Sequence, residues 1–288
     1  MEIEIRTARA DQMHLLEEWA VREGWGAGIG DVGAFHDADP EGFLLAYQGD
    51  QPVGSVSAVR YDEDYAFLGY FIVEPGRRDE GIGHRLVEAA FARVGSAASG
   101  LDGVQQQVPT YAALGFTAAH DTSRFEGSAA IIAAALAAEA LDVLDVRDPD
   151  IDELVEYDAR HVPAPRPRFV HAWVVPGSAT RRTYVARRGG HIAGYATVRG
   201  MIGGGSRIGP LFADDDVIAR GLLAATAASG MAWGEGIAID VPVPHQSAVD
   251  LVSGLGMTSS YTCTRMYRGD VRPLPLDRIW GNTTFELG

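Results

Sequence analysis

The stretch that decides the fold reads Phe71-Ile72-Val73-Glu74-Pro75-Gly76-Arg77-Arg78-Asp79-Glu80-Gly81-Ile82-Gly83-His84-Arg85-Leu86. An apolar run comes first, a proline interrupts it, and Arg-x-x-Gly-x-Gly then opens a helix. Glycines at the start of a helix let the backbone come close to a ligand, and the free N–H groups of the first turn attract phosphate oxygens with the help of the helix dipole. The stretch therefore predicts a strand, a turn and a helix that together bind an anionic cofactor.

Two other phosphate-binding motifs do not fit these residues. A Walker loop needs Gly-Lys-Ser/Thr, and the chain has no lysine, because all 24 of its basic residues are arginine. A dinucleotide fingerprint needs three glycines and then an acidic residue about 20 positions further on. The absence of lysine also excludes a pyridoxal Schiff base and a lysine general base.

A second motif, Tyr111-Ala112-Ala113-Leu114-Gly115-Phe116, follows downstream. Together with the glycine loop it resembles the GCN5-related N-acetyltransferases (GNAT), which carry Tyr-x-x-x-Gly-Phe after their motif A loop. The resemblance implies that the loop holds the pyrophosphate of acetyl-CoA and that the preceding strand holds the pantetheine arm. The cofactor-binding residues that it implies are Phe71, Ile72, Val73, Arg78, Asp79, Gly81, Ile82, Gly83 and His84.

Composition limits the class of protein. At 288 residues and 30.7 kDa the chain is longer than most single domains, so two domains are expected. No apolar run approaches the roughly 20 residues that span a bilayer, and the first residues alternate like a strand, which predicts a cytoplasmic protein without a membrane contact. The single Cys263 excludes an internal disulfide and a cysteine-rich zinc site, and the eight histidines show no metal-ligand spacing.

The net charge of −15 and the pI near 4.9 argue against nucleic-acid binding and favour a cationic acceptor. Solubility or adaptation to salt would explain the same charge.

Strand and helix signals alternate along the first half, as in an α/β layered domain. Strands are predicted at residues 3–7, 43–47, 53–60, 65–73, 101–104 and 116–125, and helices at 11–22, 32–35, 81–94 and 109–114.

The second half is predicted to be a diverged copy of the first. Its predicted strands are 141–147, 184–187, 191–199, 207–211 and 237–241, and its predicted helices are 149–160, 216–229 and 248–255. We therefore expect a catalytic domain at 1–127, an alanine-rich linker at 128–140 that could be helical, and a second domain at 141–288. Each domain is expected to be a mixed central sheet flanked by helices.

Further segments resemble a bacterial subgroup of tandem acetyltransferases with a divergent second GNAT-type domain, the YitH-like group. The resemblance covers nearly the whole chain and rests on residues 23–25, 39–43, 101–104, 157–158, 163–166, 208–211, 265–267 and 285–288. One departure is Gly26-Ala27-Gly28 after Trp25, where the group has Asn-Pro-Gly, and it suggests an altered acceptor-side loop.

Tyr111 is the predicted general acid. A tyrosine with a pKa of about 10 stays protonated near neutral pH and can donate to a departing thiolate; packing beside Phe116 is the structural alternative. Trp25 and Tyr70 are predicted to wall the acceptor pocket, although core packing would suit them equally.

The general base is not identified from the sequence. Many GNAT relatives carry a carboxylate on the central strand, where this chain has Leu68-Gly69-Tyr70. The candidates that remain open are Glu18, Glu23, Asp39, Glu63 and His36.

The second half is expected to bind no cofactor. Pro210 lacks an N–H donor, and Asp214, Asp215 and Asp216 would repel a pyrophosphate. Gly203-Gly204-Gly205 precedes the central strand and predicts a hairpin turn.

The resemblance implies an N-acetyltransferase that moves an acetyl group from acetyl-CoA directly to a small-molecule or peptide amine. The alternative is a non-catalytic acyl-CoA binding or sensing protein, and a homodimer is left open.

Overall fold

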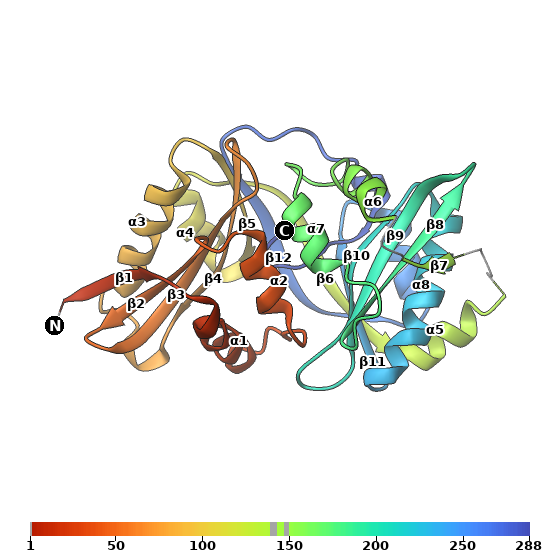
Figure 1. Cartoon of the computed structure of the whole chain (residues 1–288), viewed down its shortest axis with the longest axis horizontal. Helices are drawn as coiled ribbons and strands as arrows, with labels where there is room; N and C mark the ends of the chain where they lie inside the picture. The colour runs from red at the N-terminus through yellow and green to blue at the C-terminus, as the bar shows by residue number, and fades with distance from the viewer. Residues whose placement is uncertain (1, 139–142, 147–149) are drawn as a thin grey trace.

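The strands of both halves join in one continuous sheet (Figure 1). The computed structural model describes residues 2–138, 143–146 and 150–288. The described strands are β1 (Ile3–Thr7), β2 (Phe43–Gln48), β3 (Gln51–Arg60), β4 (Tyr65–Val73), β5 (Ala98–Val104), β6 (Thr117–Ser128), β7 (Val143–Asp145), β8 (Arg181–Arg188), β9 (His191–Gly200), β10 (Ser206–Ala213), β11 (Gly236–Pro242), β12 (Thr258–Arg268) and β13 (Ile279–Gly281). The described α-helices are α1 (Met13–Arg22), α2 (Asp31–Ala38), α3 (Ile82–Val94), α4 (Val108–Ala113), α5 (Ala129–Ala135), α6 (Ile151–Asp158), α7 (Pro167–Trp173), α8 (Asp216–Gly230) and α9 (Gln246–Gly254).

The two halves share strands at the centre of the sheet. The order along the sheet is β1-β2-β3-β4-β5-β12-β6-β11-β10-β9-β8-β7, with β13 paired to β10. Strand β12, from the second half, lies between β5 and β6 of the first half, and β6 in turn pairs with β11 of the second half. The halves are therefore joined by backbone hydrogen bonds as well as by side chains.

Helices cover the sheet in three groups. Helices α3 and α4 pack with the strands of the first half, and α5, α8 and α9 pack with those of the second half. Helices α1, α2, α6 and α7 form a shared core between the halves, in which the rings of Phe35 and Trp173 stack with centroids 5.7 Å apart. The C-terminal end of the chain lies at the centre of the molecule, between the halves (Figure 1).

Most predicted elements of the first half are confirmed, with shifted ends. The helix predicted from residue 11 begins at Met13, after a single 3-10 turn. The strand predicted at 101–104 begins at Ala98, because Ala98-Ser99-Gly100 pairs with β4 and β12 although its small residues suggest a loop. Gly100 leaves room there for the rings of Phe67 and Tyr267.

The second half follows the predicted order, with additional elements. Gly203-Gly204-Gly205 forms the predicted hairpin turn between β9 and β10. The strand predicted at 141–147 appears as β7, and the helix predicted at 149–160 appears as α6; residues 141, 142, 147 and 149 lie outside the described residues. Helix α7 and strands β12 and β13 were not predicted.

Part of the linker expected at residues 128–140 packs into the hydrophobic core of the second half. Residues 129–135 form α5, and the Ser128 hydroxyl accepts a hydrogen bond from the Ile131 amide at its start. Ala129, Ile132 and Leu136 are buried in the core that also contains α8. The domain boundaries stay a prediction.

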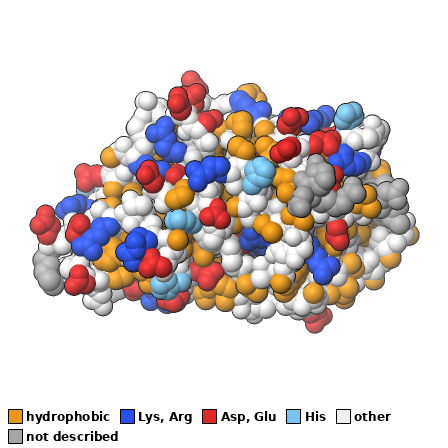
Figure 2. All heavy atoms as spheres, in the orientation of Figure 1, with side chains coloured by type: hydrophobic (Ala, Val, Ile, Leu, Met, Phe, Trp, Pro, Cys, Tyr) orange, Lys and Arg blue, Asp and Glu red, His pale blue; other side chains and the backbone are white. Residues whose placement is uncertain are grey.

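Charged side chains of both signs are mixed over the face shown in Figure 2. None of the described helices is long and apolar enough to cross a membrane.

Candidate functional site

Strands β4 and β5 diverge and open a cavity between them. Tyr65–Leu68 of β4 pairs in parallel with Ala98–Leu101 of β5, and beyond Leu101 strand β5 pairs, among the described strands, only with β12 on its other edge. A cavity of about 820 Å³ begins where they separate, and the predicted residues Phe71, Ile72 and Val73 line it. The β4 edge that faces the cavity can therefore pair with an extended ligand through its backbone.

Tyr70 bends β4 at this point. Ser55 lies opposite Ile72 and Ser57 opposite Gly69, so β4 carries an extra residue, and the backbone φ of Tyr70 is 45°. A positive φ is strained for a residue with a side chain, and surrounding contacts must hold it. The Ser55 hydroxyl donates to the Tyr70 carbonyl at 2.8 Å, which is one such contact.

Tyr70 and Trp25 both line the cavity, as predicted for an acceptor wall. Their ring centroids lie 6.2 Å apart, and the Tyr70 ring also packs edge-on against Phe35 and Phe43. Tyr70 is only 2% exposed, and burial raises the pKa of its hydroxyl well above the usual value. Its side chain thus serves the core as well as the cavity wall, and a role in acceptor binding stays a prediction.

The glycine loop leaves the start of α3 uncapped. The helix begins at Ile82 after Gly81, which has a φ of 80°, and no side chain caps it. The Arg85 amide donates to the Gly81 carbonyl, so the amides before Arg85 have no acceptor within the helix. Asp79 has a φ of 67°, and such turns direct successive amides toward one side. The loop presents donors suited to a pyrophosphate.

The predicted loop residues divide into two groups. Arg78, Asp79 and Gly83 line the cavity, whereas Gly81, Ile82 and His84 do not. Ile82 is buried in the core below α3, and the exposed His84 ring lies 3.2 Å from Glu88. These last residues are placed to contribute backbone amides to a ligand, while their side chains serve the fold or the surface.

Gly83 has a steric role in this loop. A Cβ at Gly83 would lie 3.1 Å from the Phe71 ring, so a glycine lets α3 come close to β4.

We predict that Gly81→Asp weakens acetyl-CoA binding roughly tenfold or more, a cost of about 1.4 kcal/mol, because it adds bulk and negative charge where the pyrophosphate is expected. Calorimetry on the folded variant measures the change. Gly95→Asp is the matched control, since Gly95 is an exposed glycine with a φ of 63° at the other end of α3. Equal acetyl-CoA affinity in the two variants would rule out the assignment of the pyrophosphate to this loop.

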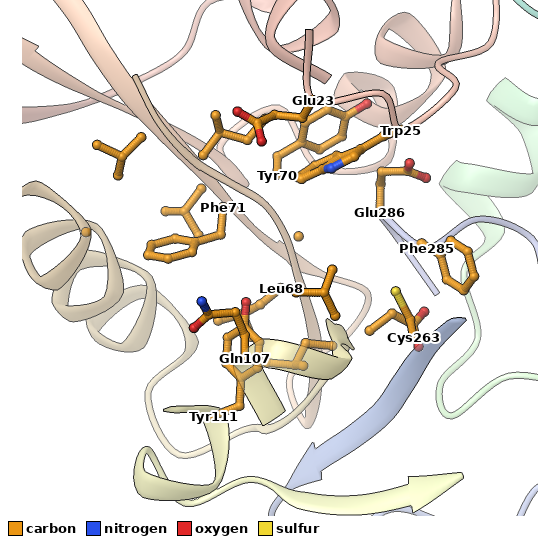
Figure 3. Close-up of a pocket in the computed structure, with 18 of the residues that line it drawn as sticks. Glu23, Trp25, Leu68, Tyr70, Phe71, Gln107, Tyr111, Cys263, Phe285 and Glu286 are labelled. Carbon is orange, nitrogen blue, oxygen red and sulfur yellow. The ribbon is translucent and has the colours of Figure 1, made fainter. Parts of the chain in front are cut away.

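Tyr111 lines the cavity from α4, beside the end of β5. Its ring packs against Gly103, where a Cβ would lie 2.9 Å from a ring carbon, and edge-on against Phe116 with centroids 6.4 Å apart. Burial raises the pKa of Tyr111 to about 12, so the hydroxyl keeps its proton at neutral pH. Figure 3 shows Tyr111 and Gln107 across the cavity from Trp25 and Tyr70.

Arginines hold the loop that carries Trp25. Arg124 of β6 and Arg207 of β10 donate to the Trp25 carbonyl at 3.1 and 2.8 Å. Gly26 has a φ of 67°, and a Cβ there would lie 2.7 Å from the Met201 side chain. The altered sequence after Trp25 is therefore explained by close contact with the second half.

Among the five candidate bases, only Glu23 lines the cavity. Arg78 donates to it at 2.6 Å, so its carboxylate is engaged in an ion pair. Asp39 is 2.7 Å from Arg93 and lies outside the cavity lining, as do Glu18, Glu63 and His36.

Two further ionisable groups line the cavity: Asp102 is paired with an arginine, and Cys263 stays neutral. Asp102 accepts two hydrogen bonds from Arg265, at 2.7 and 2.8 Å. Cys263 is buried, and burial raises the pKa of its thiol to about 12, so it stays protonated.

Glu286 also lines the cavity, and the sequence reasoning missed it as a site residue. It belongs to the ending at residues 285–288, where its place in the resemblance to the YitH-like group was the available signal.

The corresponding groove of the second half contains part of the chain itself. Ser206–Ile208 of β10 pairs in parallel with Ile237–Ile239 of β11. Beyond these residues β10 pairs with β13. The Asn282 amide donates to the Asp240 carbonyl of β11 at 2.7 Å, so the segment spans the gap between the two strands.

The start of α8 is capped by a carboxylate. The Asp215 side chain accepts from the Ile218 amide at 3.1 Å and lies 2.6 Å from Arg188. Asp215 thus uses a first-turn amide of α8, whereas no described side chain caps the corresponding amides of α3.

Diverging parallel strands, a bulged central strand and an uncapped glycine-led helix define an α/β domain suited to an acyl-CoA ligand. Residues 10–116 match a family described as "Acetyltransferase (GNAT) family", and residues 154–281 match one described as "Acetyltransferase (GNAT) domain". The chain belongs to the GNAT superfamily, with two GNAT domains in tandem, and is a GNAT-type acyltransferase.

Similar proteins cover both halves. The holothin acyltransferase of Pseudoalteromonas sp. (strain SANK 73390) is 30% identical over 287 residues, covering 98% of this chain and 94% of that protein. The crystal structure of a putative acetyltransferase from Pyrococcus horikoshii has a TM-score of 0.80 at 21% identity, covering 99% of this chain and 96% of the other. A tandem GNAT protein from the clavulanic acid biosynthesis pathway has a TM-score of 0.65 at 17% identity, covering 92% of this chain and 98% of the other.

Proposed function

We propose that this chain transfers an acetyl group from acetyl-CoA to the amine of a small molecule, without an acyl-enzyme intermediate. The observation that carries the proposal is the single cavity that contacts both the β4 edge with its glycine loop and the aromatic residues Trp25 and Tyr70. The first region suits the donor, and the second suits an acceptor with apolar surface. The full-length similarity to a holothin acyltransferase supports a small-molecule acceptor, and holothin is the first acceptor to test.

The chain's own groups supply most of what the reaction needs. The amides of residues 79–84 would bind the pyrophosphate, and the β4 edge would pair with the pantetheine arm. The Tyr111 hydroxyl would donate its proton to the sulfur as the C–S bond breaks, and would recover a proton from solvent. Cys263 is a neutral thiol, which supports direct transfer over an acyl-cysteine route.

The test is turnover with purified protein. Acetyl-CoA is incubated with holothin and a panel of primary amines, release of the free thiol is followed, and propionyl-CoA and longer acyl-CoA donors are compared. Amide formation with matching thiol release is expected. Acetyl-CoA binding without turnover for any acceptor or donor would favour the alternative of an acyl-CoA sensor.

We also predict that one acetyl-CoA binds per chain. The second groove contains β13 and residue 282, and Asp215 caps α8 where a pyrophosphate would need free donors. Equilibrium binding at saturating acetyl-CoA measures the stoichiometry, with Gly81→Asp as a control for the first site. Two equivalent sites per chain would contradict this assignment of the second domain.

A further inference from the structure

Residues 282–288 run from the second half into the first and are fixed at several points. The Asn282 amide bonds to β11, as described above. Arg166 donates to the Thr283 hydroxyl at 2.7 Å and to the Gly288 carbonyl at 2.8 Å, and the Tyr61 hydroxyl donates to the Leu287 carbonyl at 2.7 Å. This segment therefore holds Glu286 in a defined position.

The segment crosses β4 at Gly69. A Cβ at Gly69 would collide with the backbone carbonyl of Glu286, so β4 cannot carry a side chain there without moving the segment. The Glu286 side chain instead enters the cavity beside this part of β4. Figure 3 shows it near Trp25 and Phe285, across the cavity from Tyr111.

Glu286 differs from the other carboxylates of the cavity. Glu23 and Asp102 are held by arginines, and Asp79 and Glu126 are exposed to solvent. Glu286 is 7% exposed, and within the described chain its carboxylate makes no hydrogen bond or ion pair with another residue. The Glu286 carboxylate is therefore a buried group at the cavity that can take up a proton.

The charges around Glu286 act in opposite directions. Burial raises the pKa of Glu286 above its usual range, and nearby arginines partly offset this by favouring the charged form. The groups that interact electrostatically with Glu286 are Arg124 of β6, Arg199 of β9, Arg207 of β10, Tyr70 of β4 and Tyr261 of β12.

Each of the three arginines has at least one partner other than Glu286, although Nη1 and Nη2 of Arg199 and Nε of Arg207 make no hydrogen bond within the described residues. Arg124 is paired with Asp240 at 2.8 Å and Arg199 with Asp31 at 2.8 Å, while Arg207 donates to the Trp25 carbonyl.

We propose that Glu286 is the general base that deprotonates the acceptor amine. The inference rests on the proposed acyl transfer at this cavity. Glu286 takes one proton from the ammonium and releases it to solvent, and the neutral amine attacks the thioester carbon. As the C–N bond forms and the C–S bond breaks, the sulfur takes a proton from Tyr111, and the surplus proton on nitrogen leaves to solvent, from which Tyr111 recovers one.

The first experiment compares Glu286→Gln with Glu286→Asp in the full-length protein, using holothin or whichever panel amine the wild type acetylates. Glu286→Gln is expected to lower kcat on the order of 10²-fold, the scale of a lost general base, with acetyl-CoA affinity within about threefold of wild type. Glu286→Asp should retain part of the rate. Glu235→Gln is the control, because it removes an exposed carboxylate that does not line the cavity, and it should leave kcat unchanged.

The pH dependence of the reaction distinguishes two roles for Glu286: a general base, or a carboxylate that only balances the charge of the nearby arginines. The wild-type kcat/KM should fall as pH drops through the raised pKa of Glu286, since protonated Glu286 accepts no proton, and Glu286→Gln should lack this acidic limb. A titration of ¹³C-labelled glutamate carboxyls by NMR, with Glu286 assigned by its loss in Glu286→Gln, should give the same pKa without any turnover.

Chemical rescue by added carboxylates is a second test, and no rescue is expected if Glu286 has a purely structural role. Glu286→Ala should recover activity with added formate and more with acetate, the stronger base. Wild-type turnover with unchanged kcat in Glu286→Gln, or a rescue that ignores base strength, would overturn the role of Glu286 alone. No turnover by the wild type with any acceptor would overturn the proposed function and this inference together.

Discussion

Replacing Tyr111 with phenylalanine is expected to lower kcat roughly 10²-fold or more while acetyl-CoA affinity changes little. The ring stays, so its packing against Gly103 and Phe116 is kept and only the hydroxyl is lost. Without that proton the thiolate must leave unprotonated or take a proton from water. Steady-state kinetics with acetyl-CoA and calorimetric binding measure the two quantities.

The raised pKa of Tyr111 gives this prediction a pH signature. Because burial lifts the pKa to about 12, wild-type turnover should show no alkaline loss from this tyrosine up to about pH 10, where an ordinary tyrosine would be half ionised. Tyr47→Phe is the control, since the Tyr47 hydroxyl bonds to Gln12 outside the cavity. An unaltered kcat in Tyr111→Phe, with chemistry shown to limit the rate, would return Tyr111 to a packing role.

The parts of the site that the sequence predicted are local in the chain. An apolar run, a proline and three glycines lie within sixteen consecutive positions, 71–86, and they form the end of β4, the loop and the start of α3 as expected. Each feature depends on residues within this stretch, such as the φ of Gly81 or the clearance between Gly83 and Phe71. Tyr111 is also placed by local sequence, because α4 follows β5 after a single 3-10 turn at Gln105–Gln107.

What the sequence did not predict depends on contacts between distant residues. Ala98-Ser99-Gly100 has weak strand character and becomes a strand because β4 and β12 pair on its two sides. Glu286 is 217 positions from Gly69, and only the path of residues 282–288 brings them together. The five candidate bases from the sequence all lie within residues 18–63, whereas the carboxylate beside the central strand comes from the far end of the chain.

The insertion of β12 between strands of the first half predicts that a fragment of residues 1–127 does not fold on its own. In the full chain β12 lies between β5 and β6 and is antiparallel to both. In the fragment β5 and β6 could meet only by a new parallel pairing, and Leu101 and Phe116 would lose Met266, a buried member of their core.

We therefore expect the 1–127 fragment to show no cooperative thermal unfolding and no acetyl-CoA binding, as measured by circular dichroism and calorimetry. Co-expression with residues 128–288 is the control, because it supplies β11, β12 and the segment that carries Glu286. Recovery of binding in the co-expressed pair would show that the fragment lacks a partner and is not damaged by the cut. If the isolated fragment instead unfolded cooperatively and bound acetyl-CoA as tightly as the full chain, the first half would fold on its own, and β12 would contribute neither to the stability of this sheet nor to its donor site.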